Sequence, residues 1–274
     1  MSEWGRGRSV RGRKAEPALG PTLDLHPRPR PPTPPPRPRS RVYQYYLPVF
    51  AWVKHQAAAH AAGGGGGPLV VGVSAPQGCG KTTLVAELEA LAPEAGLAAA
   101  SVSIDDFYLT RAEQAATAAA SGGNPLLELR GNAGTHDLAL GTRTLDALIH
   151  APPGATVPLP RYDKAAFGGL ADRAPEQGWP SAAAPVDVIL LEGWMLGFAP
   201  VGGEAAAAAS PHLPAVDAAL AAYAPAWDSR VGAWLVVDAP SPDCVYAWRA
   251  QAEVAMRASG KGGMTDEQAS FCFV

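Results

Sequence analysis

Residues 69–83 read LVVGVSAPQGCGKTT, and this stretch decides the fold. Leu69–Val73 is a short, continuous, β-branched apolar run, which is typical of a strand buried on both faces of a parallel sheet. Ser74–Thr83 then places glycines, a lysine and threonines between that strand and a helix expected over Lys81–Leu91. Glycines let backbone N–H groups approach phosphates closely, and a helix N-terminus adds its dipole. The stretch therefore predicts a phosphate-binding loop.

This loop follows the pattern G-x-x-x-x-G-K-[ST], with Ala75 in place of the first glycine. We keep the assignment because alanine has a small side chain. Lys81 is expected to neutralise the β- and γ-phosphates of ATP, and the Thr82 hydroxyl to hold Mg²⁺. Helix amides and Lys81 would favour a thiolate at Cys79, although a small apolar filler is the alternative interpretation. The candidate nucleotide-binding residues of the loop are Gly78, Cys79, Gly80, Lys81, Thr82 and Thr83.

Strands and helices continue to alternate after the loop. Apolar runs predict further strands at Ala98–Ile104, Val186–Leu191 and Ala233–Val237. Helix signals are a capping box that begins at Thr110 and opens an Ala-rich helix ending near Gly122, an amphipathic stretch over Asp137–His150, and a helix start at Ser241–Asp243. The sequence therefore predicts an α/β fold, a P-loop NTPase-type doubly wound parallel sheet with flanking helices. In such a sheet, ligands bind at the carboxyl ends of the strands.

The region before the loop divides into two segments. Residues 1–40 are Arg-rich and acid-poor, as in an organelle transit peptide, and we expect them to lie outside the fold. Their Pro-rich run is equally typical of an extended linker or a ligand for a Pro-binding module, and a disordered tail is the remaining alternative. Residues 41–67 are predicted to form a lead-in helix around Pro48 and a flexible Gly-rich connector that begins at Ala57.

Charge and composition exclude several classes of protein. Of the 274 residues, the first 41 carry ten basic and three acidic side chains, while the whole chain has a net charge of -3. The body is therefore acidic, and we expect no nucleic-acid partner, because phosphate contacts need clustered Lys and Arg. No run approaches the roughly 20 apolar residues of a membrane span, so no membrane partner is expected. The widely spaced Cys79, Cys244 and Cys272 indicate neither a disulfide framework nor a zinc site, and they favour a reducing compartment.

Three acidic residues follow predicted strands. Asp105 and Asp106 end the second strand, and Glu192 follows the strand at 186–191, in the position of a Walker B acid. Transfer of phosphate to a hydroxyl needs a carboxylate that accepts the proton, and Mg²⁺ needs oxygen ligands. The catalytic candidates are therefore Lys81, Asp105 and Glu192, and the metal candidates Thr82, Asp105 and Glu192. The alternative is that the acids cap helices or lie in turns.

Two polar loops and one helix face supply cations. The loop at 129–137 contributes Arg130, His136 and Asp137 as candidate substrate-binding residues, and the loop at 160–164 contributes Arg161, Tyr162 and Lys164. Cations and donors in Gly- or Pro-shaped loops suit an anionic substrate, although solvated loop charges are the alternative. Arg249 and Arg257 share a helix face with Glu253 and could cover ATP, or form a solvated ion-pair stripe.

Six blocks resemble, in order, the D-glycerate 3-kinases of plants and algae, P-loop kinases related to phosphoribulokinase, uridine kinase and pantothenate kinase. The blocks are SAPQGCGKTTL, SIDDFYLT, NPLLELRGNAGTHD, PRYDK, LLEGWMLGF and WRAQAEVAMR. The resemblance implies phosphorylation of D-glycerate to 3-phosphoglycerate with ATP and Mg²⁺, the closing step of photorespiration, in the chloroplast stroma; a cytoplasmic location is the alternative. By similarity, Asp105 matches the carboxylate that activates the substrate hydroxyl, and Glu192 the acid near Mg²⁺. Arg161, Lys164 or Arg130 is expected to hold the substrate carboxylate.

The resemblance departs from the family pattern at the end of the chain. Family members continue beyond Met264–Glu267, whereas this sequence turns into Gln268–Val274. The implied P-loop kinase domain, over residues 68–274, is thus expected to lack a last strand and helix. Two other functions stay open: a kinase of another small hydroxylated metabolite, and a non-catalytic nucleotide-binding fragment.

Overall fold

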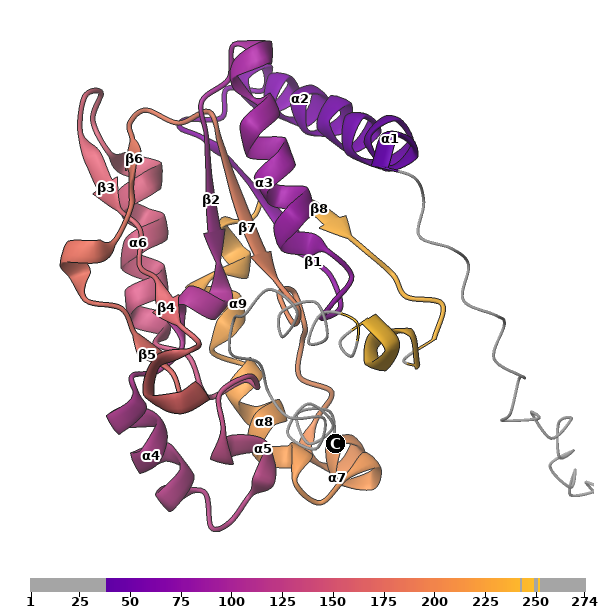
Figure 1. Ribbon diagram of the computed structural model, residues 1–274, viewed down its shortest axis with the longest axis vertical. Coiled ribbons are helices and arrows are strands. Elements are labelled where there is room, and N and C mark those ends of the chain that lie inside the picture. The colour runs from indigo at the N-terminus through magenta and orange to yellow at the C-terminus, as the bar shows by residue number, and fades with distance from the viewer. Residues whose placement is uncertain (1–37, 242, 249–250, 252–274) are drawn as a thin grey trace, which may run out of the picture.

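A four-stranded parallel sheet forms the centre of the molecule (Figure 1). The structure is a computed structural model, and it describes residues 38–241, 243–248 and 251. The strands are β1 (Leu69–Ser74), β2 (Ala99–Ser103), β7 (Val188–Gly193) and β8 (Ala233–Val236), and their order in the sheet is β2-β7-β1-β8. All neighbours are parallel, with Val71 beside Leu190 on one side and Ala233 on the other. This sheet confirms the predicted α/β class.

The two faces of the sheet bury different sets of side chains, because successive residues of a strand point to opposite faces. Leu69, Val71 and Val73 face α3 (Lys81–Leu91), which contributes Leu84, Val85 and Leu88 to this core. Val70 faces the other side, where α6 (Leu138–His150) packs with the fully buried Trp227. Covering both faces explains why residues 69–73 of β1 do not alternate between apolar and polar side chains.

The N-terminal helical segment packs against the α3 face. It consists of α1 (Pro38–Arg41), a π-helical stretch η1 (Val42–Tyr46) and α2 (Leu47–Ala62). Tyr46, Val53 and Ala57 are buried in the same core as β1. The helix predicted around Pro48 is present, but residues 57–62, which we expected in the flexible connector, are helical. Helix-favouring alanines and burial of Ala57 explain the difference.

Shorter elements connect the strands. Helices α4 (Arg111–Ala120), α5 (Pro125–Glu128), α7 (Gly203–Ala209), α8 (Leu213–Leu220) and α9 (Tyr223–Ala226) gather toward the carboxyl ends of the strands (Figure 1), and residues 243–248 are also helical. Short 3₁₀ turns lie at Pro93–Ala95 (η2), Ile104–Phe107 (η3), Ala166–Gly169 (η4), Glu176–Gly178 (η5) and Asp228–Arg230 (η6). The capping box predicted at Thr110 is present, since Thr110 and Glu113 satisfy each other's backbone N–H groups.

Two small antiparallel sheets were not predicted. One pairs β3 (Thr156–Pro158) with β6 (Ser181–Ala183), and the other pairs β4 (Tyr162–Asp163) with β5 (Asp172–Arg173). We call the segment from residue 160 to residue 173, which contains β4 and β5, the substrate hairpin, after the substrate-binding residues that the sequence predicts in it. Because its two strands have only two residues each, they carry too short a pattern to be recognised in sequence.

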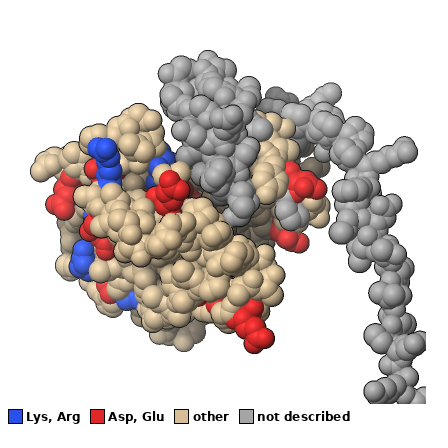
Figure 2. All heavy atoms as spheres, turned by 90° about the horizontal axis from the view of Figure 1, so that it is seen from below, with Lys and Arg blue, Asp and Glu red and all other residues tan. Residues whose placement is uncertain are grey.

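Two observations on the described residues concern nucleic-acid and membrane binding. On the face seen from below (Figure 2), most of the described surface is uncharged, and the Lys and Arg side chains that can be seen there are scattered rather than gathered in a stripe. In the described part of the chain, no helix is both long enough and apolar enough to cross a membrane. Residues 1–37, for which a transit peptide is one interpretation, lie outside the described residues.

Candidate active site

The phosphate-binding loop joins β1 to α3 as the sequence predicts. Gly78 and Gly80 have φ angles of 76° and 93°, a left-handed conformation that favours glycine at both positions. Ala75 is buried, and its N–H donates to the carbonyl of Gly193 at 3.1 Å. Among the described non-glycine residues only Phe167 and Ala171 have a left-handed backbone, so Ala75 adopts an ordinary one. The alanine that departs from the motif is therefore accommodated without backbone strain.

A cavity of about 540 Å³ lies beside the loop, at the carboxyl edge of the sheet. It brings together six of the predicted site residues, which come from four separate stretches of the chain: Gly78, Lys81, Thr82, Asp105, Arg130 and Lys164. Its apolar wall includes Leu126, Trp194, Phe198, Val236 and Val245. The cavity therefore joins a phosphate-binding loop, a strand-end acid and two further cations in one space.

Glu192 lies behind the loop and is almost fully buried, with 3% of its surface exposed. Its Oε1 accepts a hydrogen bond from the Thr82 hydroxyl at 3.1 Å, and its Oε2 is 4.0 Å from Lys81 Nζ. Burial raises the pKa of Glu192, although the charge of Lys81 opposes the rise. Oε2 has no hydrogen-bond partner among the described residues. A buried carboxylate oxygen without a donor, next to the motif threonine, fits a bound cation.

Both carboxylate oxygens of Asp105 have partners in the cavity. Oδ1 accepts a hydrogen bond from the Tyr108 hydroxyl at 2.9 Å, and Oδ2 is paired with Lys164 Nζ at 2.6 Å. Burial alone would raise the pKa of Asp105, but the charges of Lys164 and Lys81 outweigh it and lower this pKa to about 2. Asp105 is therefore an ionised carboxylate at neutral pH.

Asp106 points to a different environment from its neighbour. Its Oδ2 pairs with Arg161 Nη1 at 3.1 Å, and its Oδ1 accepts a hydrogen bond from the backbone N–H of Tyr162 at 3.0 Å. Burial raises the pKa of Asp106 despite the charge of Arg161. Asp106, Arg161 and Tyr162 do not line the cavity. They fasten the substrate hairpin to the segment that carries Asp105.

Some residues of the loop at 129–137 line the cavity, and others support it from behind. Arg130 lines the cavity, donates to the carbonyls of Gly169 and Leu170 at 3.3 Å, and lies 5.8 Å from the Tyr162 ring. His136 does not line it; the ring is buried, and Nδ1 lies 2.8 Å from the Tyr223 hydroxyl oxygen. Burial lowers the pKa of His136 to about 4.

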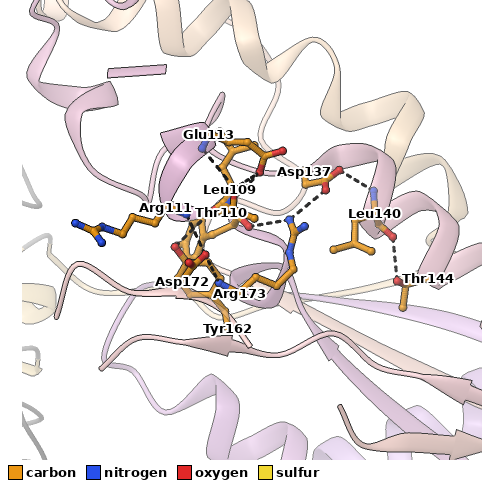
Figure 3. Close-up of polar contacts among 11 residues, drawn as sticks. Leu109, Thr110, Arg111, Glu113, Asp137, Leu140, Thr144, Tyr162, Asp172 and Arg173 are labelled. Carbon is orange, nitrogen blue, oxygen red and sulfur yellow. Dashed lines mark hydrogen bonds and ion pairs between the residues drawn. The ribbon is translucent and has the colours of Figure 1, made fainter. Parts of the chain in front are cut away.

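Asp137 also lies away from the cavity and supports the fold. Its Oδ1 accepts from the backbone N–H of Leu140 and so caps α6, and its Oδ2 pairs with Arg173 at 3.1 Å. Figure 3 shows the Arg173 side chain pointing toward Asp137, with Leu140 and Thr144 beyond. Arg173 also donates to the carbonyl of Tyr108, so this network ties the substrate hairpin to both neighbouring loops.

The remaining predicted nucleotide-binding residues differ in placement. Gly78 lines the cavity, whereas Cys79, Gly80 and Thr83 belong to the loop and helix start behind it. Burial raises the pKa of the Cys79 thiol and outweighs the lowering by the Lys81 backbone N–H and charge. The expected thiolate is therefore a wrong prediction, because burial disfavours charge. Arg249 and Arg257 lie outside the described residues.

Two residues that contribute to the site, Tyr108 and Arg173, are not among those predicted from the sequence. Tyr108 lines the cavity and donates to Asp105, and Arg173 links three loops. Tyr108 follows Asp105 by three residues in SIDDFY, and residues three apart lie on the same side of a 3₁₀ turn. This spacing could have predicted the contact between the two side chains. Arg173 has no comparable local signal.

Fold and site together define a P-loop kinase: a parallel sheet with a G-K-T loop after its central strand, and an ionised carboxylate facing that loop across a cavity. No protein-family model matches the sequence. Individual relatives do match it.

The chain is 47% identical over 232 residues to "D-glycerate 3-kinase, chloroplastic" of Arabidopsis thaliana, and it spans about half (51%) of that protein while the match covers 83% of the chain. It is 35% identical to the kinase Mug58 of Schizosaccharomyces pombe, over 74% of the chain and 76% of the relative. A solved D-glycerate 3-kinase from Cryptococcus neoformans superposes with a TM-score of 0.72 at 32% identity, over 82% of this chain and 83% of that one. The chain therefore belongs to the D-glycerate 3-kinase family of P-loop kinases.

Proposed function

We propose that this protein transfers the γ-phosphoryl group of ATP to D-glycerate and forms 3-phosphoglycerate. The names of the Arabidopsis and Cryptococcus relatives support the substrate. The main support for the proposal is that Lys81 of the phosphate loop and Asp105 line the same cavity. A phosphate donor and a hydroxyl acceptor can meet in this space.

The phosphate end of ATP belongs on the loop. Backbone N–H groups from Gly78 to Thr82 and the ammonium of Lys81 would bind the β- and γ-phosphates. Mg²⁺, when bound, would neutralise negative charge on these phosphates, and Thr82 with the buried Glu192 would hold it. Asp105, a metal candidate in the sequence, has both oxygens engaged by protein groups.

D-Glycerate is a carboxylate, and besides Lys81 the described residues that line the cavity include two cations that could bind it. Arg130 and Lys164 line the cavity, while Arg161 is held outside it by Asp106. The planar guanidinium of Arg130 can bind a carboxylate with two parallel hydrogen bonds. Lys164 has an exposed, flexible side chain that can move from Asp105 to the substrate. We therefore assign the substrate carboxylate to Arg130 and Lys164.

The transfer step uses Asp105 as proton acceptor. The acceptor hydroxyl oxygen forms a bond to the γ-phosphorus, the bond between that phosphorus and the ADP oxygen breaks, and the hydroxyl proton passes to Asp105. A carboxylate with a pKa near 2 is a weak base while Lys164 is paired with it. Movement of Lys164 to the substrate carboxylate would remove the largest cause of the low pKa and prepare Asp105 for the step.

We propose a location in the chloroplast stroma and a role in photorespiration. The word "chloroplastic" in the name of the Arabidopsis relative and the Arg-rich composition of residues 1–40 support it. In this proposal residues 1–40 are a transit segment and residues 68–274 form the kinase domain. Import of the full chain into isolated chloroplasts tests the location, and failure to enter would contradict it.

The substrate proposal is tested with a panel of acceptors. The purified chain is given ATP and Mg²⁺ with D-glycerate, L-glycerate, glycerol or uridine, and ADP release is followed. We expect kcat/KM for D-glycerate to exceed the values for glycerol and uridine by at least about 10-fold, because Arg130 and Lys164 select a carboxylate. L-Glycerate has the same carboxylate, so it tests whether the cavity also selects the configuration at C2. A higher kcat/KM with another acceptor would mean that this acceptor, and not D-glycerate, is the substrate. ATP binding without any acceptor-dependent ADP release would instead identify a non-catalytic nucleotide-binding protein.

A further inference from the structure

The two oxygens of Asp105 are held by groups that differ in freedom. Tyr108, which holds Oδ1, is 4% exposed, whereas the Lys164 side chain, which holds Oδ2, is 57% exposed. Lysine has a long stem with rotatable bonds, so Lys164 can leave Oδ2. Oδ2 is therefore the oxygen that can be uncovered for a substrate.

Tyr108 is fixed from several sides. Its ring packs 4.5 Å from the His136 ring and 5.4 Å from the Tyr162 ring, measured between centroids. Its backbone forms a short antiparallel bridge with His136, and its carbonyl accepts a hydrogen bond from Arg173 at 3.1 Å. The hydroxyl that meets Asp105 therefore has a defined position, and the bond from Arg173, which also pairs with Asp137 (Figure 3), helps to maintain it.

We infer that Tyr108 is a positioning residue that holds Oδ1 of Asp105 and thereby directs Oδ2 toward the acceptor hydroxyl. This inference rests on the proposed function. A base that is held in one orientation meets the reacting proton more often, and small misplacements of catalytic groups slow reactions strongly. In the transfer step the substrate proton moves to Oδ2, while Tyr108 keeps its own proton and its bond to Oδ1.

A double-mutant cycle tests whether Tyr108 acts through Asp105. Wild type, Tyr108→Phe, Asp105→Asn and the double variant are compared for kcat and for the KM of ATP and D-glycerate. Each kcat is expressed per ATP-binding site counted by calorimetry, so that loss of folded protein is not counted as slower turnover. We expect Tyr108→Phe to lower kcat roughly 10-fold, as for one hydrogen bond to a charged group, with both KM values within about threefold. In the Asp105→Asn background it should lower kcat no further.

Tyr162→Phe is the matched control. Its hydroxyl is also in the buried aromatic cluster, but it donates to the carbonyl of Leu109 at 3.2 Å and does not touch Asp105. Removal of this hydroxyl should leave kcat within about twofold, because the base keeps its orientation. An equal fall of kcat in Tyr108→Phe and Tyr162→Phe would contradict the inference and indicate a general loss of packing.

The outcomes separate this inference from the function on which it rests. With an active wild type, three results would each overturn the positioning role: an unchanged kcat in Tyr108→Phe, the same fall in both backgrounds, or a raised KM for D-glycerate at unchanged kcat. The last result would mean that Tyr108 binds the substrate directly. A wild type that does not phosphorylate D-glycerate would overturn the proposed function and this inference with it.

Discussion

Asp105 and Asp106 are adjacent in sequence yet have opposite surroundings. Asp105 faces the cavity and Lys164, whereas Asp106 is turned to Arg161, which lies 55 residues further along the chain. The sequence could predict an acid at this strand end, because strand ends meet ligands in parallel sheets. Which of the two faces the phosphate loop depends on a contact with a distant hairpin. No local pattern carries that information.

Replacing Asp105 with Asn should keep ATP binding and lower kcat by roughly 10²- to 10⁴-fold, the range for a lost general base. Asparagine has the same shape but cannot accept the hydroxyl proton. Steady-state kinetics with D-glycerate and calorimetry with ATP measure the two effects separately.

Asp106→Asn is the control for that variant. It weakens the ion pair with Arg161 while the Asn side-chain oxygen can still accept from the Tyr162 N–H, so kcat should fall far less. If Asp106→Asn abolishes turnover and Asp105→Asn does not, the role of base belongs to Asp106.

His136 predicts a pH dependence of stability. Its folded pKa is about 4 because burial disfavours the charged ring, while its ordinary value is 6.5. The unfolded chain therefore binds a proton more readily between these values, and the free energy of unfolding falls as pH drops from about 6.5 to 4. The loss from this group approaches about 3 kcal/mol at the lower limit. Thermal unfolding measured across this range should show the decline.

The variant His136→Gln removes the titrating group and should flatten the pH dependence over this interval, whatever its melting temperature at pH 7. A wild-type slope retained in His136→Gln would show that another group causes the decline.

At the scale of elements, the parts with strong local signals could be predicted. The start and end of α3, the core of β1 and the capping box of α4 follow from apolar period, glycine placement and Thr110 with Glu113. The π-helical stretch before α2 and the substrate hairpin could not be predicted. The hairpin depends on long-range bonds such as Tyr162 to Asp106, and its strands are too short to show a period.

In helix α6, replacing Gly141 with Ala should lower the stability of the protein, although helix propensity alone predicts an increase. Gly141→Ala would usually stabilise a helix by about 1 kcal/mol. Here an added Cβ would lie 2.5 Å from Nε1 of Trp227, which is fully buried and cannot move aside easily. Overpacking of this kind typically costs about 1–3 kcal/mol, so the variant should be less stable than wild type in denaturant unfolding.

Gly203→Ala in α7 is the matched substitution. A Cβ at this position would meet no atom within 4 Å, and the backbone is not left-handed. It should be neutral or slightly stabilising, by up to about 1 kcal/mol. Equal or greater stability of Gly141→Ala relative to wild type would mean that Trp227 adapts to the extra methyl group.

At the scale of the whole molecule, the sheet topology assembles the site. Parallel pairing places the carboxyl ends of β1, β2 and β7 at one edge, and these ends carry the phosphate loop, Asp105 and Glu192. The α/β class and the edge of the sheet at which the site lies were predictable from the alternation of strands and helices. That Arg130 and Lys164 line the cavity while Arg161 does not could not be predicted, because it depends on long-range contacts such as the pair between Arg161 and Asp106.

The proposal that the protein phosphorylates the C3 hydroxyl of D-glycerate is tested by identifying the product. The protein is incubated with ATP, Mg²⁺ and D-glycerate, and the products are resolved by proton-detected ³¹P NMR, with Asp105→Asn alongside. The proposed function predicts ADP and 3-phosphoglycerate in equal amounts from wild type, with the phosphorus coupled to the two C3 protons, and a strongly reduced rate from Asp105→Asn. Phosphate on C2, or ADP accumulating with inorganic phosphate and no phosphorylated glycerate, would contradict it.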